Sequence, residues 1–100
     1  MKFLGKEIGD GHPVYIISEA GICHQGKLDV ALKMCDIAKQ CGADAVKFQK
    51  RDLASLYRAD VLAEPSNESH SLGVYIPILR ECELSETDHL KLKAHCDSLG

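Results

Sequence analysis

The sequence predicts an α/β protein with an amino-terminal β-hairpin followed by two parallel strand–helix units. An apolar run at residues 14–17 ends in polar residues, which is typical of a short strand buried on both faces. A helical repeat covers residues 27–41, and a second short strand pattern covers residues 43–49. Because a strand, a helix and a strand follow one another, we expect a right-handed crossover and parallel pairing.

The hairpin is expected at the start of the chain. Residues 2–9 hold the apolar pair Phe3-Leu4 and then Ile8, and a Gly-Asp-Gly-His-Pro segment follows at residues 9–13. An Asp-Gly pair beside an X-Pro bond is typical of a hairpin or a tight turn.

Residues 27–41 are the clearest helix. One polar stripe recurs at helical spacing, and apolar residues fill the remaining positions, as expected for a helix that lies on a sheet. The members of the stripe are Asp29, Lys33, Asp36 and Gln40. Gly42 follows where a helix end favours a positive φ.

The second half is predicted to be loop and helix. Residues 50–72 are expected to form a long loop with one helical turn near 53–57, and a weaker helix over 72–82 contains Pro77, which suggests a kink or an early end. Ser85 is placed to cap a helix over 86–98, whose buried seam would be Leu92, Cys96 and Leu99. The chain stops where a third strand would begin, so residues 1–100 are expected to be the amino-terminal piece of a longer chain.

Composition excludes several classes of protein. The net charge of −3 and the 5% aromatic content argue against nucleic-acid binding, and the 45% of hydrophobic residues argues against disorder. No apolar run approaches the ~20 residues of a membrane span, and no signal peptide is visible. Five cysteines at irregular spacing do not describe a disulfide framework, so a reducing cytoplasm is expected.

Three polar side chains mark the carboxyl ends of the two predicted parallel strands. Glu19 ends the first strand, and Lys47 and Gln49 share one side of the second. Because carboxyl ends of parallel strands form ligand crevices, an acid, an ammonium group and an amide are expected at one rim. They could hold a phosphate or carboxylate, move a proton and bind a sugar. The alternative is an ion pair that only satisfies two buried charges.

The loop at residues 21–26 is a weaker signal. Its two glycines allow close backbone approach and the following helix start offers free N–H groups, but an ordinary connecting loop fits equally well. His24 could be a ligand or a hydrogen-bonding loop residue. The pairs Cys23-His24 and His95-Cys96 lack zinc-site spacing. Lys50 and Arg51 could extend an anion site or begin a solvated loop.

Three segments resemble the sialic acid synthase family, the NeuB-like N-acetylneuraminate synthases. They are YIISEAGICHQG at 15–26, GADAVKFQ at 42–49 and ECELSETDHLKLKAHCDSLG at 81–100. The resemblance implies a TIM (β/α)8 barrel, usually followed by an antifreeze-like domain, of which residues 1–100 are the amino-terminal fragment. The remaining strands and the antifreeze-like domain would lie outside this chain.

The resemblance also implies an activity. The full-length protein would be a cytoplasmic, homodimeric enzyme that condenses phosphoenolpyruvate with an N-acylated amino sugar such as N-acetylmannosamine, giving a nonulosonic acid and phosphate. A divalent metal ion, Mn²⁺ or Mg²⁺, would act as Lewis acid. Its ligands would lie outside this chain, so we expect no metal site here and an inactive fragment.

Individual positions match the family motifs. Glu19 matches the active-site glutamate, Lys47 the lysine that holds phosphoenolpyruvate, and Gln49 the glutamine facing the sugar. His24 matches the motif histidine, expected in substrate binding through a positioning role. At position 23 this chain has cysteine where the family has asparagine. A barrel that binds a carbohydrate or a phosphosugar without catalysis is therefore an alternative function. Another phosphoenolpyruvate-dependent aldolase-type synthase is the third possibility.

Overall fold

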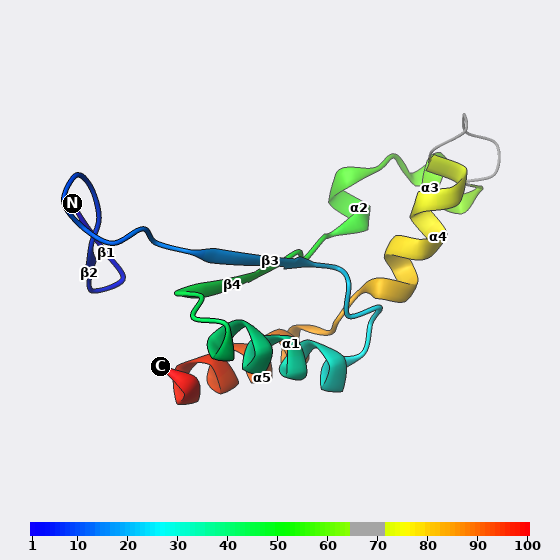
Figure 1. Cartoon of the computed structure of the whole chain (residues 1–100). Helices are drawn as coiled ribbons and strands as arrows, with labels where there is room; N and C mark the ends of the chain where they lie inside the picture. The colour runs from blue at the N-terminus through cyan, green and yellow to red at the C-terminus, as the bar shows by residue number, and fades with distance from the viewer. Residues whose placement is uncertain (65–71) are drawn as a thin grey trace.

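Figure 1 shows the computed structural model of the chain, which describes residues 1–64 and 72–100. Its elements in chain order are β1 (Lys2–Phe3), β2 (Lys6–Glu7), β3 (Ile17–Gly21), α1 (Leu28–Gln40), β4 (Ala45–Phe48), α2 (Leu53–Leu56), α3 (Ala59–Ala63), α4 (Leu72–Cys82) and α5 (Glu86–Leu99). Among the described helices, none combines the length and the apolar character needed to cross a bilayer.

The centre of the structure is a strand–helix–strand unit. β3 pairs in parallel with β4, and α1 connects the two strands, which confirms the predicted parallel pairing. In Figure 1, α1 and α5 lie side by side on the same face of the β3–β4 pair. The other face of the pair carries no helix in this view.

The first strand of this unit begins later than its apolar pattern suggested. The prediction placed it at residues 14–17, whereas β3 starts at Ile17. The partner strand explains the shift, because the ladder starts where Ile17 faces Ala45. Just before it, the Asp44 carboxylate accepts the Ile16 N–H at 2.7 Å, and Val14 is left 81% exposed without a partner strand.

The amino terminus forms a small antiparallel pair. Lys2 faces Glu7 and Phe3 faces Lys6, so the chain reverses at residues 4–5. Residues 9–12 form a separate turn closed by a hydrogen bond from the His12 N–H to the Gly9 carbonyl. The Asp-Gly segment is therefore a turn, but it follows the β1–β2 pair instead of connecting its strands.

The core lies between the sheet and the two long helices. Its buried members are Ala31, Cys35, Leu84 and Leu92, and Val46 and Phe48 of β4 pack against them. The Ser85 hydroxyl accepts the Asp88 N–H at 3.1 Å, which confirms the predicted cap of α5. Cys96 and Leu99 also pack on this core, as the expected seam requires.

The segment at residues 50–72 contains more helix than expected. α2 confirms the predicted turn near 53–57, but α3 was not predicted, and its Val61 is buried. Residues 65–71 of the predicted loop lie outside the described residues. α4 continues through Pro77, which is exposed, while Ile76 and Leu79 are buried. The expected early end therefore does not occur.

Candidate functional site

Glu19 and Lys47 face each other across the two central strands. They are register partners in the β3–β4 ladder, and the Lys47 ammonium forms an ion pair with the Glu19 carboxylate. The Glu19 side chain is 49% exposed and that of Lys47 is 62% exposed. The predicted proximity is confirmed. The two side chains also form the ion pair of the alternative interpretation, with both charges partly exposed in this chain, and a role of the pair in binding or catalysis stays a prediction.

Strand alternation sets the direction of these side chains. Val46 and Phe48 pack into the core, whereas Lys47 is exposed between them. On β3, Ala20 is buried and Glu19 is exposed in the same way. The two charged side chains therefore share the sheet face opposite to α1 and α5.

A backbone N–H fixes one oxygen of the Glu19 carboxylate. Glu19 Oε1 accepts the N–H of Gly21 at 3.1 Å, at the point where the ladder register shifts between the two residues. Gly21 has φ +55°, a conformation that favours glycine. Side-chain patterns in the sequence carry no signal for this contact, because the donor belongs to the backbone.

Gln49 lies directly after β4 at the same end of the sheet. Its backbone N–H donates to the Gly21 carbonyl at 3.1 Å, which holds it beside the end of β3. Its side-chain Oε1 accepts from the Arg51 guanidinium at 2.7 Å. The Arg51 guanidinium, for which the sequence offered an anion site or a solvated loop, therefore contacts the predicted amide.

His24 lies beneath the surface of the loop that follows β3. Its side chain is 1% exposed, and its ring lies 5.8 Å from that of Phe48. Nδ1 accepts the Gly26 N–H at 3.1 Å, and Nε2 has no hydrogen-bond partner among the described residues. The structure thus places His24 away from the exposed rim formed by Glu19 and Lys47, and its substrate-binding role stays a prediction.

The surroundings of His24 disfavour its charged form. Burial lowers the pKa of the imidazole below its ordinary value of 6.5, and the nearby His89 lowers it further. Glu83 acts in the opposite direction with a smaller effect. The ring is therefore suited to accepting the Gly26 N–H as a neutral group.

Gly26 brings the loop into direct contact with the end of α4. A side-chain carbon at this position would lie 2.2 Å from the Glu81 carbonyl oxygen, so only glycine fits this approach. The close backbone approach that Gly26 allows thus lets the loop pack against α4. The sequence pattern did not identify Glu81 as the neighbour, because the two segments are far apart in the chain.

The described residues do not provide a metal centre. They contain no group of three or more His, Cys, Asp or Glu side chains arranged to hold a metal ion. The Glu19 carboxylate and the Lys47 ammonium group form a net-neutral pair at the rim.

Several known proteins are similar to this chain in sequence. The sequence model of the NeuB family matches residues 34–100. N-acetylneuraminate-9-phosphate synthase from Homo sapiens is 39% identical over 97 residues, which are 96% of this chain and 27% of the human protein. N,N'-diacetyllegionaminic acid synthase from Legionella pneumophila is 35% identical over 103 residues, covering 95% of this chain and 27% of that protein.

A solved structure agrees with the sequence comparison. The crystal structure of spore coat polysaccharide biosynthesis protein SpsE from Bacillus subtilis superimposes with a TM-score of 0.65 at 33% identity, covering 99% of this chain and 25% of SpsE. The chain thus spans about a quarter of the length of these relatives. With its family match and its identity to these synthases, the chain belongs to the NeuB family.

Proposed function

We propose that this chain is the amino-terminal part of the TIM barrel of a NeuB-type synthase. The full-length enzyme would condense phosphoenolpyruvate with an N-acylated amino sugar, giving a sialic-acid-type nonulosonic acid and phosphate. The observation that carries this proposal is the pairing of Glu19 with Lys47 at one register position near the strand ends. The names of the human and Legionella relatives support a synthase of this class.

Lys47 would bind the phosphate or the carboxylate of phosphoenolpyruvate. The Lys47 ammonium lies on the sheet face that the core does not cover in this chain, where an anionic group of the substrate could approach it beside Glu19. A lysine offers a compact positive charge with three donors, which suits a phosphate. In the reaction, this charge would also stabilise negative charge on the departing phosphate.

Glu19 and Gln49 would contact the amino sugar, which accepts the phosphoenolpyruvate carbon. The Gly21 N–H holds one Glu19 oxygen in place, so the carboxylate keeps its position when Lys47 turns to the substrate. It could then order a hydroxyl group or move a proton. The Gln49 side-chain oxygen accepts a hydrogen bond from Arg51. The hydrogens of the same amide group could then donate to a sugar hydroxyl or an acyl oxygen.

The divalent metal ion of this reaction would be held by other parts of the full-length enzyme. The described residues do not form a site for it, so no step here is assigned to the metal. The proposal therefore predicts that the isolated 100-residue chain releases no phosphate.

Cys23 favours a second candidate function. It is exposed in the loop after β3, and its N–H donates to the Ala20 carbonyl at 3.1 Å. A thiol is a weaker hydrogen-bond donor than an amide, so a contact made by an asparagine at this position would be lost. A barrel without that contact could bind a sugar or a phosphosugar without converting it.

Phosphate release by the full-length protein tests the proposal. The assay supplies phosphoenolpyruvate, N-acetylmannosamine or its 6-phosphate, and Mn²⁺, and we expect release that requires both organic substrates. Glu19→Gln should lower the rate at least tenfold, whereas Glu86→Gln, at an exposed glutamate of α5, should not. Sugar binding without any phosphate release would contradict the synthase and favour the binding protein.

A further inference from the structure

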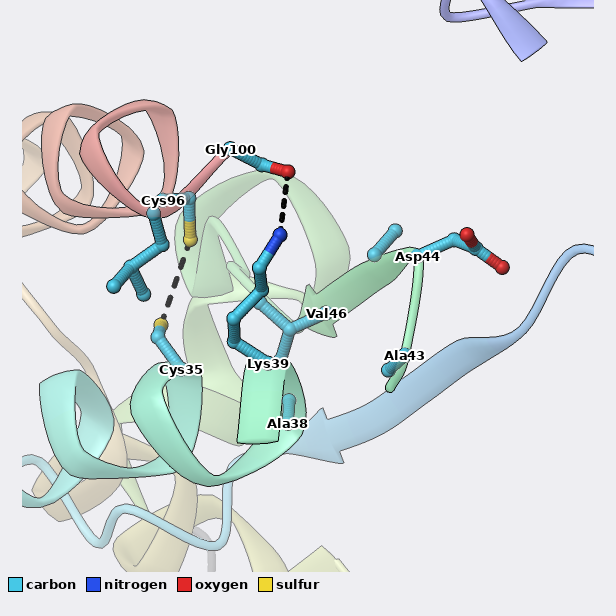
Figure 2. Close-up of a pocket in the computed structure, with 10 residues that line it drawn as sticks. Cys35, Ala38, Lys39, Ala43, Asp44, Val46, Cys96 and Gly100 are labelled. Atoms are coloured by element: carbon cyan, nitrogen blue, oxygen red, sulfur yellow. Dashed lines mark hydrogen bonds between the residues drawn. The ribbon is translucent and has the colours of Figure 1, made fainter. Parts of the chain in front are cut away.

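Two thiols meet where α1 and α5 pack together. Cys35 Sγ and Cys96 Sγ are 3.5 Å apart, and Figure 2 shows the two side chains pointing toward each other from the two helices. The next pair along the same interface is also joined, since His95 Nε2 lies 2.6 Å from Asp36 Oδ1. Two consecutive residues of each helix thus contact each other, which fixes the thiols face to face.

The two thiols differ in their access to solvent. Cys35 is 2% exposed and belongs to the core, whereas Cys96 is only partly buried. A cavity of about 60 Å³ lies beside them, lined among others by Ala38, Val46 and Leu99. In this chain Cys96 is therefore the more accessible of the two thiols for a small oxidant.

We propose that Cys35 and Cys96 are an oxidative modification site, at which a hydroperoxide converts the two thiols into a disulfide that joins α1 to α5. This inference is independent of the proposed synthase activity. Two thiols held face to face can form a disulfide once one of them is oxidised to a sulfenic acid.

The reaction has two balanced steps. The Cys96 sulfur first attacks the terminal peroxide oxygen, which gives a sulfenic acid on Cys96 and releases water, or an alcohol from an organic hydroperoxide. The Cys35 sulfur then attacks the sulfenic sulfur. The S–O bond breaks as the S–S bond forms, and the hydroxyl leaves as water with the proton of the Cys35 thiol. Two thiols are oxidised, and one peroxide bond is reduced.

The order of the two steps follows from the surroundings of Cys35. Burial raises the pKa of its thiol to about 12, and its hydrogen bond with Cys96 acts in the same direction. A thiol that stays protonated is a poor first nucleophile toward a peroxide. Cys35 therefore serves as the resolving thiol: the packing that holds the two sulfur atoms 3.5 Å apart offsets its low nucleophilicity once Cys96 carries the sulfenic oxygen.

The disulfide would stabilise this part of the fold. It would close a loop between residues 61 positions apart, which contains β4 and the whole α2–α4 region. Closing a long loop lowers the entropy of the unfolded chain. We therefore expect oxidation to raise the thermal unfolding midpoint, and reduction to reverse the change.

Peptide mapping tests the proposal on the unmodified protein. The protein is treated with hydrogen peroxide, alkylated and digested with trypsin without reduction. The peptide of residues 34–39 should appear linked to the peptide that begins at residue 94, with a mass lower by two hydrogens than the sum of the reduced peptides. In a chain that ends at residue 100, the second peptide is 94–100.

Cysteine variants test whether Cys35 and Cys96 are the two residues that become linked. Cys96→Ser should abolish the linked peptide and leave Cys35 reduced, whereas Cys35→Ala should leave Cys96 as a sulfenic acid that reacts with dimedone. The control Cys41→Ser removes an exposed thiol at the end of α1 and should keep the full yield of the link. A wild-type protein in which Cys96 is linked to Cys23 or Cys41, or in which Cys35 stays reduced while Cys96 is overoxidised, would overturn the proposal.

Discussion

Glu19 and Lys47 are register partners on adjacent parallel strands, and their side chains form an ion pair near the carboxyl ends of β3 and β4. The two side chains lie on the sheet face opposite to the helices, so their contact is separate from the core that joins β4 to α1 and α5. The pair thus brings a carboxylate and an ammonium group together on the face at which we propose that the substrate binds.

The contact between α5 and the core predicts a large loss of stability at Leu92. This side chain is 4% exposed and packs with Ala31 and Cys35. Leu92→Ala should lower the free energy of unfolding by about 2–5 kcal/mol, because it removes buried methyl groups and leaves a cavity. Leu90→Ala is the matched control, since Leu90 is 67% exposed on the same helix and should change stability by less than about 0.5 kcal/mol. Urea unfolding followed by circular dichroism measures both, and equal effects would refute the assigned core.

The approach of Gly26 to α4 predicts a difference between two glycines. Both Gly26 and Gly42 have a positive φ, so alanine at either position should cost about 1–2 kcal/mol in backbone strain. Only at Gly26 would the new carbon also meet a carbonyl, that of Glu81, while Gly42 faces open space. Gly26→Ala should therefore cost about 1–3 kcal/mol more than Gly42→Ala in the free energy of unfolding. Similar losses for the two variants would show that the loop does not rest on α4.

The buried imidazole of His24 predicts a loss of stability in weakly acidic solution. Burial and His89 lower its pKa in the folded protein, while the unfolded chain has the ordinary value near 6.5. The folded state therefore binds fewer protons than the unfolded state below this pH. The contribution of His24 is complete above pH 6.5, and it is lost as the pH falls through 6.5 toward the lower pKa of the folded state.

Unfolding at two pH values measures this contribution. The wild-type protein should lose stability between pH 7.5 and pH 5.5, and His24→Asn should lose less over the same interval. His12→Asn, which changes an exposed histidine in the turn at residues 9–12, should keep the wild-type loss. A wild-type stability that does not change over this interval would contradict the assignment.

The sequence predicts the parts of the fold that depend on local patterns. The polar stripe of α1, the Ser85 cap of α5 and the alternation of Val46, Lys47 and Phe48 all arise from neighbouring residues, and the structure agrees with them. The same alternation predicts that Glu19 and Lys47 share one rim of the sheet.

Features that depend on distant partners were not predicted. β3 starts at Ile17 because its partner β4 begins at Ala45, and the apolar residues before it carry no sign of that limit. The burial of His24 and the approach of Gly26 to Glu81 also depend on where α4 ends. α3 was missed because its five residues are too few for a helical repeat to be recognised.

Binding of phosphoenolpyruvate tests the central role of Lys47 most directly. Isothermal titration calorimetry on the full-length protein compares the wild type with Lys47→Ala and with Lys33→Ala, which removes an exposed lysine of α1. We expect Lys47→Ala to weaken binding at least tenfold, because it removes the charge that would contact the phosphate or carboxylate, and Lys33→Ala to bind like the wild type. Unchanged affinity in Lys47→Ala would contradict an anion site at the ends of β3 and β4.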